Sequence, residues 1–192
     1  MQNQMPKGTF DILPYGAEEE WQSSDLWQFV EMTLRKIACD YGYREIRTPM
    51  YEMTGLFDRG IGETSDIVTK EMFTFQDKGG RSITLRPEGT AAVMRSFVEH
   101  NLANLGAVHK FFYTGPMFRY ERPQSGRYRQ HHQFGIEAIG NGTPEQDAEV
   151  IDLLMEFYHR LGLKHLKVHL NTVGDLESRT RFRNALLDYL RP

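Results

Sequence analysis

The chain has 192 residues, of which 40% are hydrophobic and 26% are charged, and these values predict one large domain, or slightly more, with a real core. The formal net charge of −3 does not favour bulk binding to nucleic acid, so any nucleic-acid partner would need a local basic surface or another domain. No apolar run approaches the ~18 residues of a membrane helix and the N-terminus lacks a secretory signal, so no membrane partner and a cytoplasmic location are expected.

The first predicted elements are a long helix and a short strand. Apolar residues recur at helical spacing over residues 18–41, and Gly42 is a natural stop. Residues 43–47 then predict a strand, which Pro49 closes. The single cysteine, Cys39, is expected to be a buried small hydrophobe rather than a nucleophile. From the pattern alone, the helix either packs on its own sheet or forms an interface with another chain.

The rest of the chain predicts a mixture of strands and helices. Residues 72–75 and 82–85 predict a hairpin, and a helix follows from Pro87-Glu88 to about Asn104. The string Thr143-Pro144-Glu145-Gln146 is a capping box that starts another helix. The remaining predicted elements are a strand at 108–121 with a break at 115–116, a strand at 165–170, and a helix that Asp175 caps and that runs to Leu190. Single loops and hairpins between the strands predict an α+β domain on a largely antiparallel sheet.

The stretch 118–137 carries the strongest chemical signal, because two predicted strands flank an arginine-rich loop. Arg119 and Glu121 share one face of the first strand, since side chains alternate along a strand. On the second strand one face holds Gln133, Gly135 and Glu137, and the apolar alternates can pack on a core. Four arginines and one glutamate between residues 119 and 129 give a local charge of 4 − 1 = +3. This combination predicts a polyphosphate site beside a polar pocket, in which Gly135 leaves room for a ligand.

The same stretch resembles motif 2 of the class II aminoacyl-tRNA synthetases, and most closely that of the histidyl-tRNA synthetases. The shared strings are Phe118-Arg119-x-Glu121, Arg122-Pro123-Gln124, Gly126-Arg127-Tyr128-Arg129-Gln130 and Gln133-x-Gly135-x-Glu137. Three further segments agree: Lys7-Gly8-Thr9-Phe10-Asp11, Gly42-Tyr43-Arg44-Glu45-Ile46-Arg47-Thr48-Pro49 and Thr84-Leu85-Arg86-Pro87-Glu88-Gly89-Thr90. The resemblance covers essentially the whole chain and implies an antiparallel sheet flanked by helices.

The resemblance also implies a domain organisation. Residues 1–192 resemble the N-terminal part of the catalytic domain, with motif 1 at about 18–50 and motif 2 at about 110–140. In that family the motif 1 unit builds a homodimer interface. Motif 3, with its catalytic arginine, and an anticodon-binding domain are not found in this sequence, so the chain is expected to be a fragment that is inactive alone.

The resemblance assigns roles to individual residues. Arg119 is implied as the catalytic residue, at the α-phosphate of ATP and the amino-acid carboxylate, because its planar fork binds oxyanions bidentately. Glu121 is implied at the adenine amino group. Arg127 is the favoured contact to the outer phosphates, and Arg122 and Arg129 are weaker candidates. Each loop arginine could instead be a solvated surface charge.

The histidine-binding residues come from two segments. Glu88, Gly89 and Thr90 resemble the family's grip on the α-amino group, although a helix-start acid favoured by the dipole would be the simpler interpretation of Glu88 alone. Gln133 is implied at the amino end and Glu137 at the imidazole, with Arg119 at the carboxylate. A metal site at His131 and His132 is not expected, because neighbouring strand residues point to opposite faces.

Two functions are consistent with the resemblance. The first is a histidine-tRNA ligase, which activates L-histidine with ATP and Mg²⁺ to histidyl-adenylate and transfers it to tRNA(His). The alternative is the histidine-binding regulatory subunit of ATP phosphoribosyltransferase, which lacks the anticodon domain and typically erodes the arginine-rich loop. The intact loop here favours the ligase.

Overall fold

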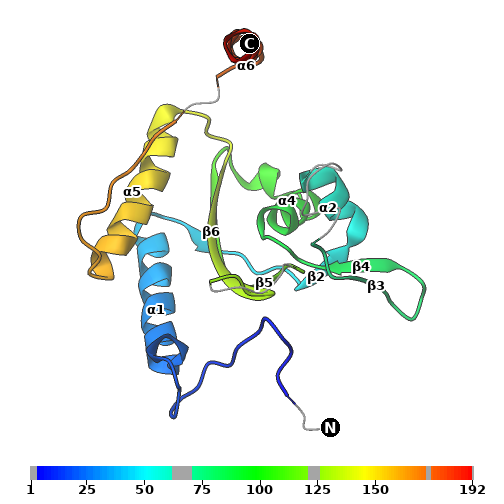
Figure 1. Cartoon of the computed structure of the whole chain (residues 1–192), viewed down its shortest axis with the longest axis vertical. Helices are drawn as coiled ribbons and strands as arrows, with labels where there is room; N and C mark the ends of the chain where they lie inside the picture. The colour runs from blue at the N-terminus through cyan, green and yellow to red at the C-terminus, as the bar shows by residue number, and fades with distance from the viewer. Residues whose placement is uncertain (1–3, 62–70, 121–125, 172–173, 192) are drawn as a thin grey trace. The chain divides into compact units, whose positions relative to one another are not determined.

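The computed structural model describes residues 4–61, 71–120, 126–171 and 174–191 (Figure 1). The chain divides into two units, unit 1 (Met1–Gly162) and unit 2 (Leu163–Pro192). Helices and mainly antiparallel strands make up unit 1, which confirms the predicted α+β class.

The first sheet of unit 1 has the order β1-β5-β6. Its centre is β5 (His109–Phe118), which pairs antiparallel with β6 (Gln130–Ile139) and parallel with β1 (Arg44–Glu45). The predicted break at Gly115-Pro116 is wrong, since β5 runs through both residues. The pairing with β1 ends at Phe112, so the missing N–H of Pro116 interrupts no ladder bond on that side.

The second sheet is antiparallel, with the order β2-β4-β3. It consists of β2 (Tyr51–Met53), β4 (Ser82–Leu85) and β3 (Thr74–Gln76), so the predicted hairpin is confirmed. Asp77 closes the hairpin turn, because its Oδ1 accepts hydrogen bonds from the backbone N–H groups of Gly79 at 2.8 Å and Arg81 at 2.9 Å.

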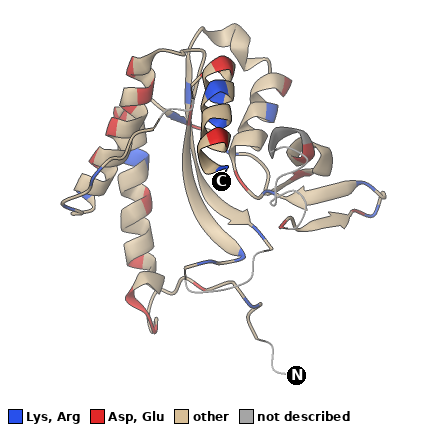
Figure 2. Ribbon diagram, turned by 45° about the horizontal axis from the view of Figure 1, so that its top comes forward, with Lys and Arg blue, Asp and Glu red and all other residues tan. Residues whose placement is uncertain are grey.

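Helices cover both faces of the first sheet (Figure 1). On one face lie α1 (Ser24–Asp40) and α5 (Pro144–Arg160), and Figure 2 shows acidic residues along both. Their core is an apolar cluster that takes in alternate residues of β6: Ile37, Ala38, Tyr43, Phe112 and Leu153, with Phe134, Ile136 and Ala138 packed against it. Near the other face lie α4 (Thr90–Glu99) and α2 (Thr54–Ile61), and Val93 of α4 packs with Tyr113 and Met117.

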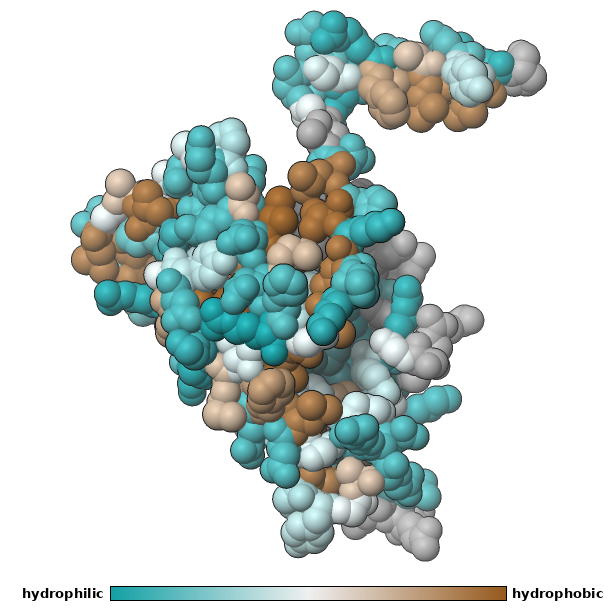
Figure 3. Space-filling model, turned by 90° about the vertical axis from the view of Figure 1, so that its left-hand side faces the viewer, coloured by the Kyte–Doolittle hydropathy of each residue, from teal (hydrophilic) through white to brown (hydrophobic). Residues whose placement is uncertain are grey.

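Unit 2 contains α6 (Leu176–Leu190). Asp175 caps this helix as predicted, since its Oδ1 accepts from the Ser178 N–H at 2.7 Å. Apolar residues gather along one side of α6 and are exposed, as Figure 3 shows in brown. Across the described residues, none of the helices combines the length and the apolar character needed to span a membrane.

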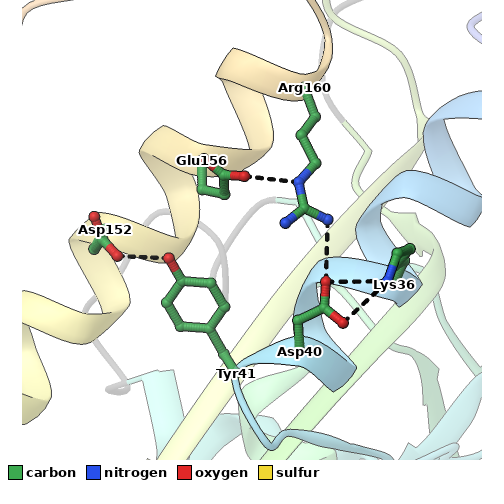
Figure 4. Close-up of polar contacts among 6 residues, drawn as sticks. All are labelled: Lys36, Asp40, Tyr41, Asp152, Glu156 and Arg160. Carbon is green, nitrogen blue, oxygen red and sulfur yellow. Dashed lines mark hydrogen bonds and ion pairs between the residues drawn. The ribbon is translucent and has the colours of Figure 1, made fainter.

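Within unit 1, polar contacts tie the end of α1 to α5 (Figure 4). The Tyr41 hydroxyl donates to Asp152 at 2.5 Å, and the hydrogen bond raises the pKa of Tyr41 to about 12. Arg160 donates to Asp40 at 3.1 Å, and Lys36 donates to the same carboxylate. The side-chain hydrogen bonds from Lys36 and Arg160 lower the pKa of Asp40.

Five local expectations differ from the structure. The helix predicted over 18–41 is a short 3-10 helix, η1 (Glu20–Gln22), followed by α1. Cys39 is exposed rather than buried, because it lies on the outer face of α1. The helix predicted from 87–88 to about 104 ends at Glu99, and a separate 3-10 helix, η2 (Leu102–Leu105), follows after Asn101, which takes the left-handed conformation.

The other two concern residues 143–170. Thr143 precedes α5 and Pro144 is its first residue, but Thr143 makes no side-chain capping bond. Residues 165–170 form no strand. His165 has φ 64, which breaks the extended run, and no strand pairs with this segment among the residues described for unit 2.

Candidate functional site

The candidate site lies on the face of the β5–β6 hairpin that is opposite to the α1–α5 core. The register pairs Tyr113 with Gly135 and Gly115 with Gln133, so these residues share one face with Glu137. The apolar alternates of β6 pack into the core as predicted. The alternation of side chains along β6 therefore puts a polar row toward α4.

Thr90 and Glu137 connect two segments that are far apart in sequence. The Thr90 hydroxyl, at the first residue of α4, donates to Glu137 Oε1 at 2.7 Å. Burial raises the pKa of Glu137, and the hydrogen bond from Thr90 opposes this rise. When it is ionised, a half-buried carboxylate in this position is a strong acceptor for a donor on a ligand.

Tyr113 fills the space between the two glycines of the site, and the sequence interpretation missed it. A Cβ on Gly89 would lie 2.2 Å from Tyr113 Cε2, and a Cβ on Gly135 would lie 2.2 Å from Tyr113 Cζ. Both positions must therefore be glycine to make room for the phenol ring. Tyr113 occupies the space beside Gly135 that was expected to be open for a ligand. Burial raises the pKa of Tyr113 to about 12, and the neighbouring Thr90 side chain opposes this rise.

A signal for Tyr113 exists only once the register of β5 and β6 is known. Tyr113 and Gly135 become direct partners as soon as the hairpin register is fixed, and a large residue opposite a glycine indicates close packing. The register itself depends on the pairing of whole strands, which residue types alone do not determine.

Glu88 caps α4. Its two carboxylate oxygens accept from the backbone N–H groups of Thr90 at 2.5 Å and Ala91 at 2.9 Å. This arrangement matches the simpler interpretation of Glu88, in which an acidic side chain is favoured at the start of a helix. Each oxygen retains a second lone pair, so the cap leaves acceptor capacity for a cation.

Arg119 lies beside the same helix start. Its Nε donates to the Pro87 carbonyl at 3.0 Å, and its backbone N–H donates to the Arg129 carbonyl at 2.9 Å. Its terminal nitrogens make no hydrogen bond or ion pair to any residue that the structure describes. Arg119 thus joins Glu88, Thr90 and the β5–β6 face in one region.

A second arginine, Arg86, is buried and was not assigned a role. It donates to the Pro116 carbonyl at 3.0 Å and to the Thr48 carbonyl at 3.1 Å. Burial lowers the pKa of Arg86. A Cβ on Gly115 would lie 2.8 Å from Arg86 Nη2, so this glycine admits the guanidinium. Arg86 fixes the segment that leads to Pro87 and Glu88.

Gln133 contributes a buried polar atom to the site. Its Oε1 is buried and has no hydrogen-bond partner within the described parts of the chain. A buried carbonyl oxygen without a partner costs free energy, about 1–3 kcal/mol, unless a ligand supplies a donor. His131 and His132 lie on the same strand, and within the described ranges no group of three or more His, Cys, Asp and Glu side chains is placed to hold a metal ion.

Two of the loop arginines, Arg127 and Arg129, are among the described residues. Arg129 lies with its guanidinium 4.2 Å from the ring centroid of Tyr120, and Arg127 is exposed. Figure 2 shows basic residues near the end of β5 and the start of β6. Glu121 and Arg122 fall outside the described residues, so the predicted adenine contact is not placed.

The raised pKa of Glu137 predicts how stability depends on pH. The folded pKa lies above the usual value of 4.5, so the stability linked to Glu137 is present below about pH 4.5 and is lost as pH rises through the folded pKa. The Glu137→Gln chain lacks this titration. Its melting temperature relative to wild type is therefore expected to increase between pH 4.5 and pH 8, measured without ligand.

Glu45 provides a control of opposite sign. A side-chain hydrogen bond from Arg35 lowers the pKa of Glu45, so its stabilising contribution is present above about pH 4.5 and is lost as pH falls. The melting temperature of Glu45→Gln relative to wild type is therefore expected to decrease as pH rises toward about 4.5 and to stay level from pH 4.5 to pH 8. If the melting temperatures of the two variants, relative to wild type, changed with pH in the same way, the burial assigned to Glu137 would be contradicted.

Comparison with known proteins shows which family this chain resembles. The family model described as histidyl-tRNA synthetase matches residues 15–180. The histidine–tRNA ligase of Protochlamydia amoebophila is 61% identical over all of this chain, which covers 45% of that protein. The histidine–tRNA ligase of Moorella thermoacetica is 58% identical over 97% of the chain and 43% of that protein.

Solved structures agree with the sequence comparison. Apo histidyl-tRNA synthetase of S. aureus is 46% identical, with a TM-score of 0.77 over 97% of this chain and 42% of that one. A protein of Bacillus halodurans described as an ATP phosphoribosyltransferase regulatory subunit/histidyl-tRNA synthetase is 27% identical, with a TM-score of 0.70 over 86% of this chain and 40% of that one. The chain spans less than half the length of these relatives. It belongs to the histidyl-tRNA synthetase family.

Proposed function

We propose that this chain supplies the histidine- and ATP-binding part of a histidine-tRNA ligase. The observation that carries the proposal is the hydrogen bond between Thr90 and Glu137, together with the contact of Arg119 with Pro87. These contacts bring a cation, two carboxylates and a buried amide without a partner to one face of β5 and β6. Such a face suits an amino acid, which carries a carboxylate and an ammonium group a short distance apart.

The proposed reaction begins with adenylate formation. The carboxylate oxygen of histidine attacks the α-phosphorus of ATP, the bond to the bridging oxygen breaks, and pyrophosphate leaves with its electron pair. Charge on the pentavalent α-phosphate is then the main quantity to stabilise, and we assign Arg119 to it. Arg127 is assigned to the outer phosphates and Glu121 to the adenine amino group. In the second step, a ribose hydroxyl of tRNA(His) displaces AMP from the adenylate.

Histidine is assigned to the opposite end of the site. Its ammonium group would donate to the Glu88 carboxylate, the Thr90 hydroxyl and the buried Oε1 of Gln133. Gly89 would lie beside it. Its imidazole N–H would donate to Glu137, whose other contacts hold it in place. A buried acceptor discriminates strongly against an amino acid that lacks this N–H, because the carboxylate is then left without a partner.

Mg²⁺ is proposed to enter with ATP. No group of three or more His, Cys, Asp and Glu side chains in the described part of the chain is placed to hold a metal ion. We therefore assign Mg²⁺ to the phosphate oxygens and to no residue. It would offset the negative charge of the triphosphate.

A histidine-binding regulatory subunit is the second candidate. The Bacillus halodurans relative carries both descriptions in its name, at 27% identity. The identity to histidine–tRNA ligases is about twice as high, at 61% and 58%. The ligase is the better supported function, because the arginine-rich loop suits the triphosphate of ATP, whereas binding of histidine alone would need only Arg119 at the carboxylate.

The test is histidine-dependent exchange of pyrophosphate into ATP by the full-length protein that carries this sequence, followed by charging of tRNA(His). Exchange and charging are expected. Histidine binding without exchange, combined with co-purification of an ATP phosphoribosyltransferase catalytic chain, would support the regulatory subunit instead.

We also propose that two copies associate through the motif 1 region. Three apolar residues on one stripe of α1 are exposed in unit 1: Leu26 at 41%, Phe29 at 48% and Met32 at 63%. Tyr51 and Met53 of β2 are exposed as well, at 56% and 53%. An apolar surface of this kind in a protein with a real core indicates an interface.

A charge on this stripe is expected to disrupt the dimer. Met32→Glu would place a carboxylate in an apolar interface, where it has no partner and is costly to desolvate. Sedimentation of the full-length protein at micromolar concentration is expected to show monomers, with the melting temperature of the monomer little changed. Met94→Glu, on the exposed side of α4, serves as the control that keeps the dimer. If Met32→Glu and Met94→Glu sedimented with the same mass, the assignment of the dimer interface to α1 would be contradicted.

A further inference from the structure

The N-terminal segment touches the arginine-rich region directly. Residues 6–10 form this segment, the N-terminal strap. The carbonyl of Gly8 accepts from the Arg129 N–H at 2.7 Å and from the Gln130 N–H at 3.4 Å. The strap therefore extends the hydrogen bonding of the hairpin at the point where β6 begins.

The conformation of the strap is held by its own residues. Gly8 has φ 86, in the left-handed region that favours glycine. Thr9 closes the turn, because its backbone N–H and its hydroxyl both donate to the Pro6 carbonyl, the hydroxyl at 2.7 Å. These bonds direct the Gly8 carbonyl toward Arg129.

Phe10 anchors the strap in an aromatic cluster. Its ring centroid lies 4.9 Å from that of Trp21 and 4.9 Å from that of Tyr128, and 5.8 Å from that of Trp27. The Trp27 indole donates to the Trp21 carbonyl at 2.7 Å, and its ring contacts His132 of β6 at 4.6 Å. The cluster thus joins the strap to α1 and to both ends of residues 128–132. Aromatic pairs of this geometry are stabilising beyond the burial of their surface.

A continuous path of hydrogen bonds leads from the strap to Arg119. The Gly8 carbonyl holds the Arg129 N–H, and the Arg129 carbonyl accepts from the Arg119 N–H at 2.9 Å. Arg119 in turn holds the Pro87 carbonyl through its Nε at 3.0 Å. The position of the two arginines is therefore coupled to the strap through backbone contacts.

We propose that Gly8 and Phe10 are positioning residues for Arg119 and Arg129, and that they set the affinity of the site for the triphosphate of ATP. The proposal rests on the proposed ligase function. Neither residue is a cation, and both act through residues 128–130: Gly8 through the backbone of Arg129 and Gln130, and Phe10 through the ring of Tyr128. Loss of either is expected to displace the arginines, while the contacts to the amino and imidazole groups of histidine, at Thr90 and Glu137, keep their geometry.

The test compares three variants of the full-length protein. Phe10→Ala removes the anchoring ring, Gly8→Ala forces a side chain into the left-handed region, and Phe10→Tyr keeps the ring. We expect the KM for ATP to rise roughly tenfold in the first two, since a displacement of about 1 Å at a positioned charge costs up to ~10²-fold. The KM for histidine should rise by no more than about twofold, because only the histidine carboxylate is placed at Arg119 while its amino and imidazole groups are held elsewhere. Phe10→Tyr should keep the KM for ATP near that of wild type. Tyr15→Ala, 86% exposed and close in sequence, is the control.

A second measurement is independent of catalysis. Hydrogen exchange of peptides that cover residues 126–130 is expected to be faster in Phe10→Ala than in wild type, because the Arg129 N–H loses its acceptor. An unchanged KM for ATP in the first two variants, or an equal rise in both KM values, would overturn the proposal. If the wild-type protein shows no pyrophosphate exchange, the ligase function fails, and unchanged hydrogen exchange at 126–130 would then overturn the positioning role on its own.

Discussion

Arg119→Ala in the full-length protein is expected to reduce the rate of histidyl-adenylate formation by about 10²–10³, because removal of one preorganised charge at a reacting centre commonly costs this much. The fold should survive. Arg119 is half-buried, its Nε makes one hydrogen bond to the Pro87 carbonyl, and the backbone bond to Arg129 does not depend on the side chain. The loss of stability should be about 1 kcal/mol, the usual net value of one hydrogen bond.

The measurement pairs single-turnover adenylate formation with thermal melting. Arg81→Ala is the matched control, because it removes an arginine of the exposed β3–β4 hairpin that pairs with Asp77. An exposed pair of this kind contributes little to stability. Near-normal adenylate formation in Arg119→Ala, or a melting temperature far below that of Arg81→Ala, would count against the catalytic assignment.

Glu137→Gln is expected to raise the KM for histidine at least about tenfold. Glutamine keeps the size and one acceptor of Glu137 but loses the charge, and a hydrogen bond to a charged group is worth about 1.5–3 kcal/mol. The amide can still accept from the Thr90 hydroxyl, so the start of α4 should keep its place. The KM for ATP should change little, because the phosphates are assigned to the arginines.

Steady-state pyrophosphate exchange with each substrate varied in turn measures both constants. Glu145→Gln changes an exposed carboxylate in the first turn of α5 and provides the control. A defect for ATP as large as the defect for histidine would mean that Glu137 faces the other substrate.

The sequence predicted the parts of this site that follow from alternation. Gln133, Gly135 and Glu137 fall on one face of β6 because side chains of a strand alternate, and the apolar residues between them pack into the core. The α+β class and the hairpin before β4 follow in the same way from short-range patterns. These features need only local residue types.

Contacts across the chain could not be predicted in this way. The place of Tyr113 depends on the register of β5 and β6, and the buried Arg86 depends on the approach of Thr48 and Pro116. The predicted strand at 165–170 fails for a related reason, since strand propensity requires a neighbouring strand to form a ladder. Residue types indicate what a segment can form, and the partner decides what it does form.

The packing of Tyr113 between Gly89 and Gly135 makes these three positions interdependent. An added methyl group at either glycine would collide with the ring, whereas a smaller residue at 113 would leave a hole and remove a hydroxyl group from Thr90 and Glu137. Paired substitutions at these sites should therefore be strongly non-additive. An attempt to redesign the pocket for a different amino acid would have to change the tyrosine and its glycines as a set.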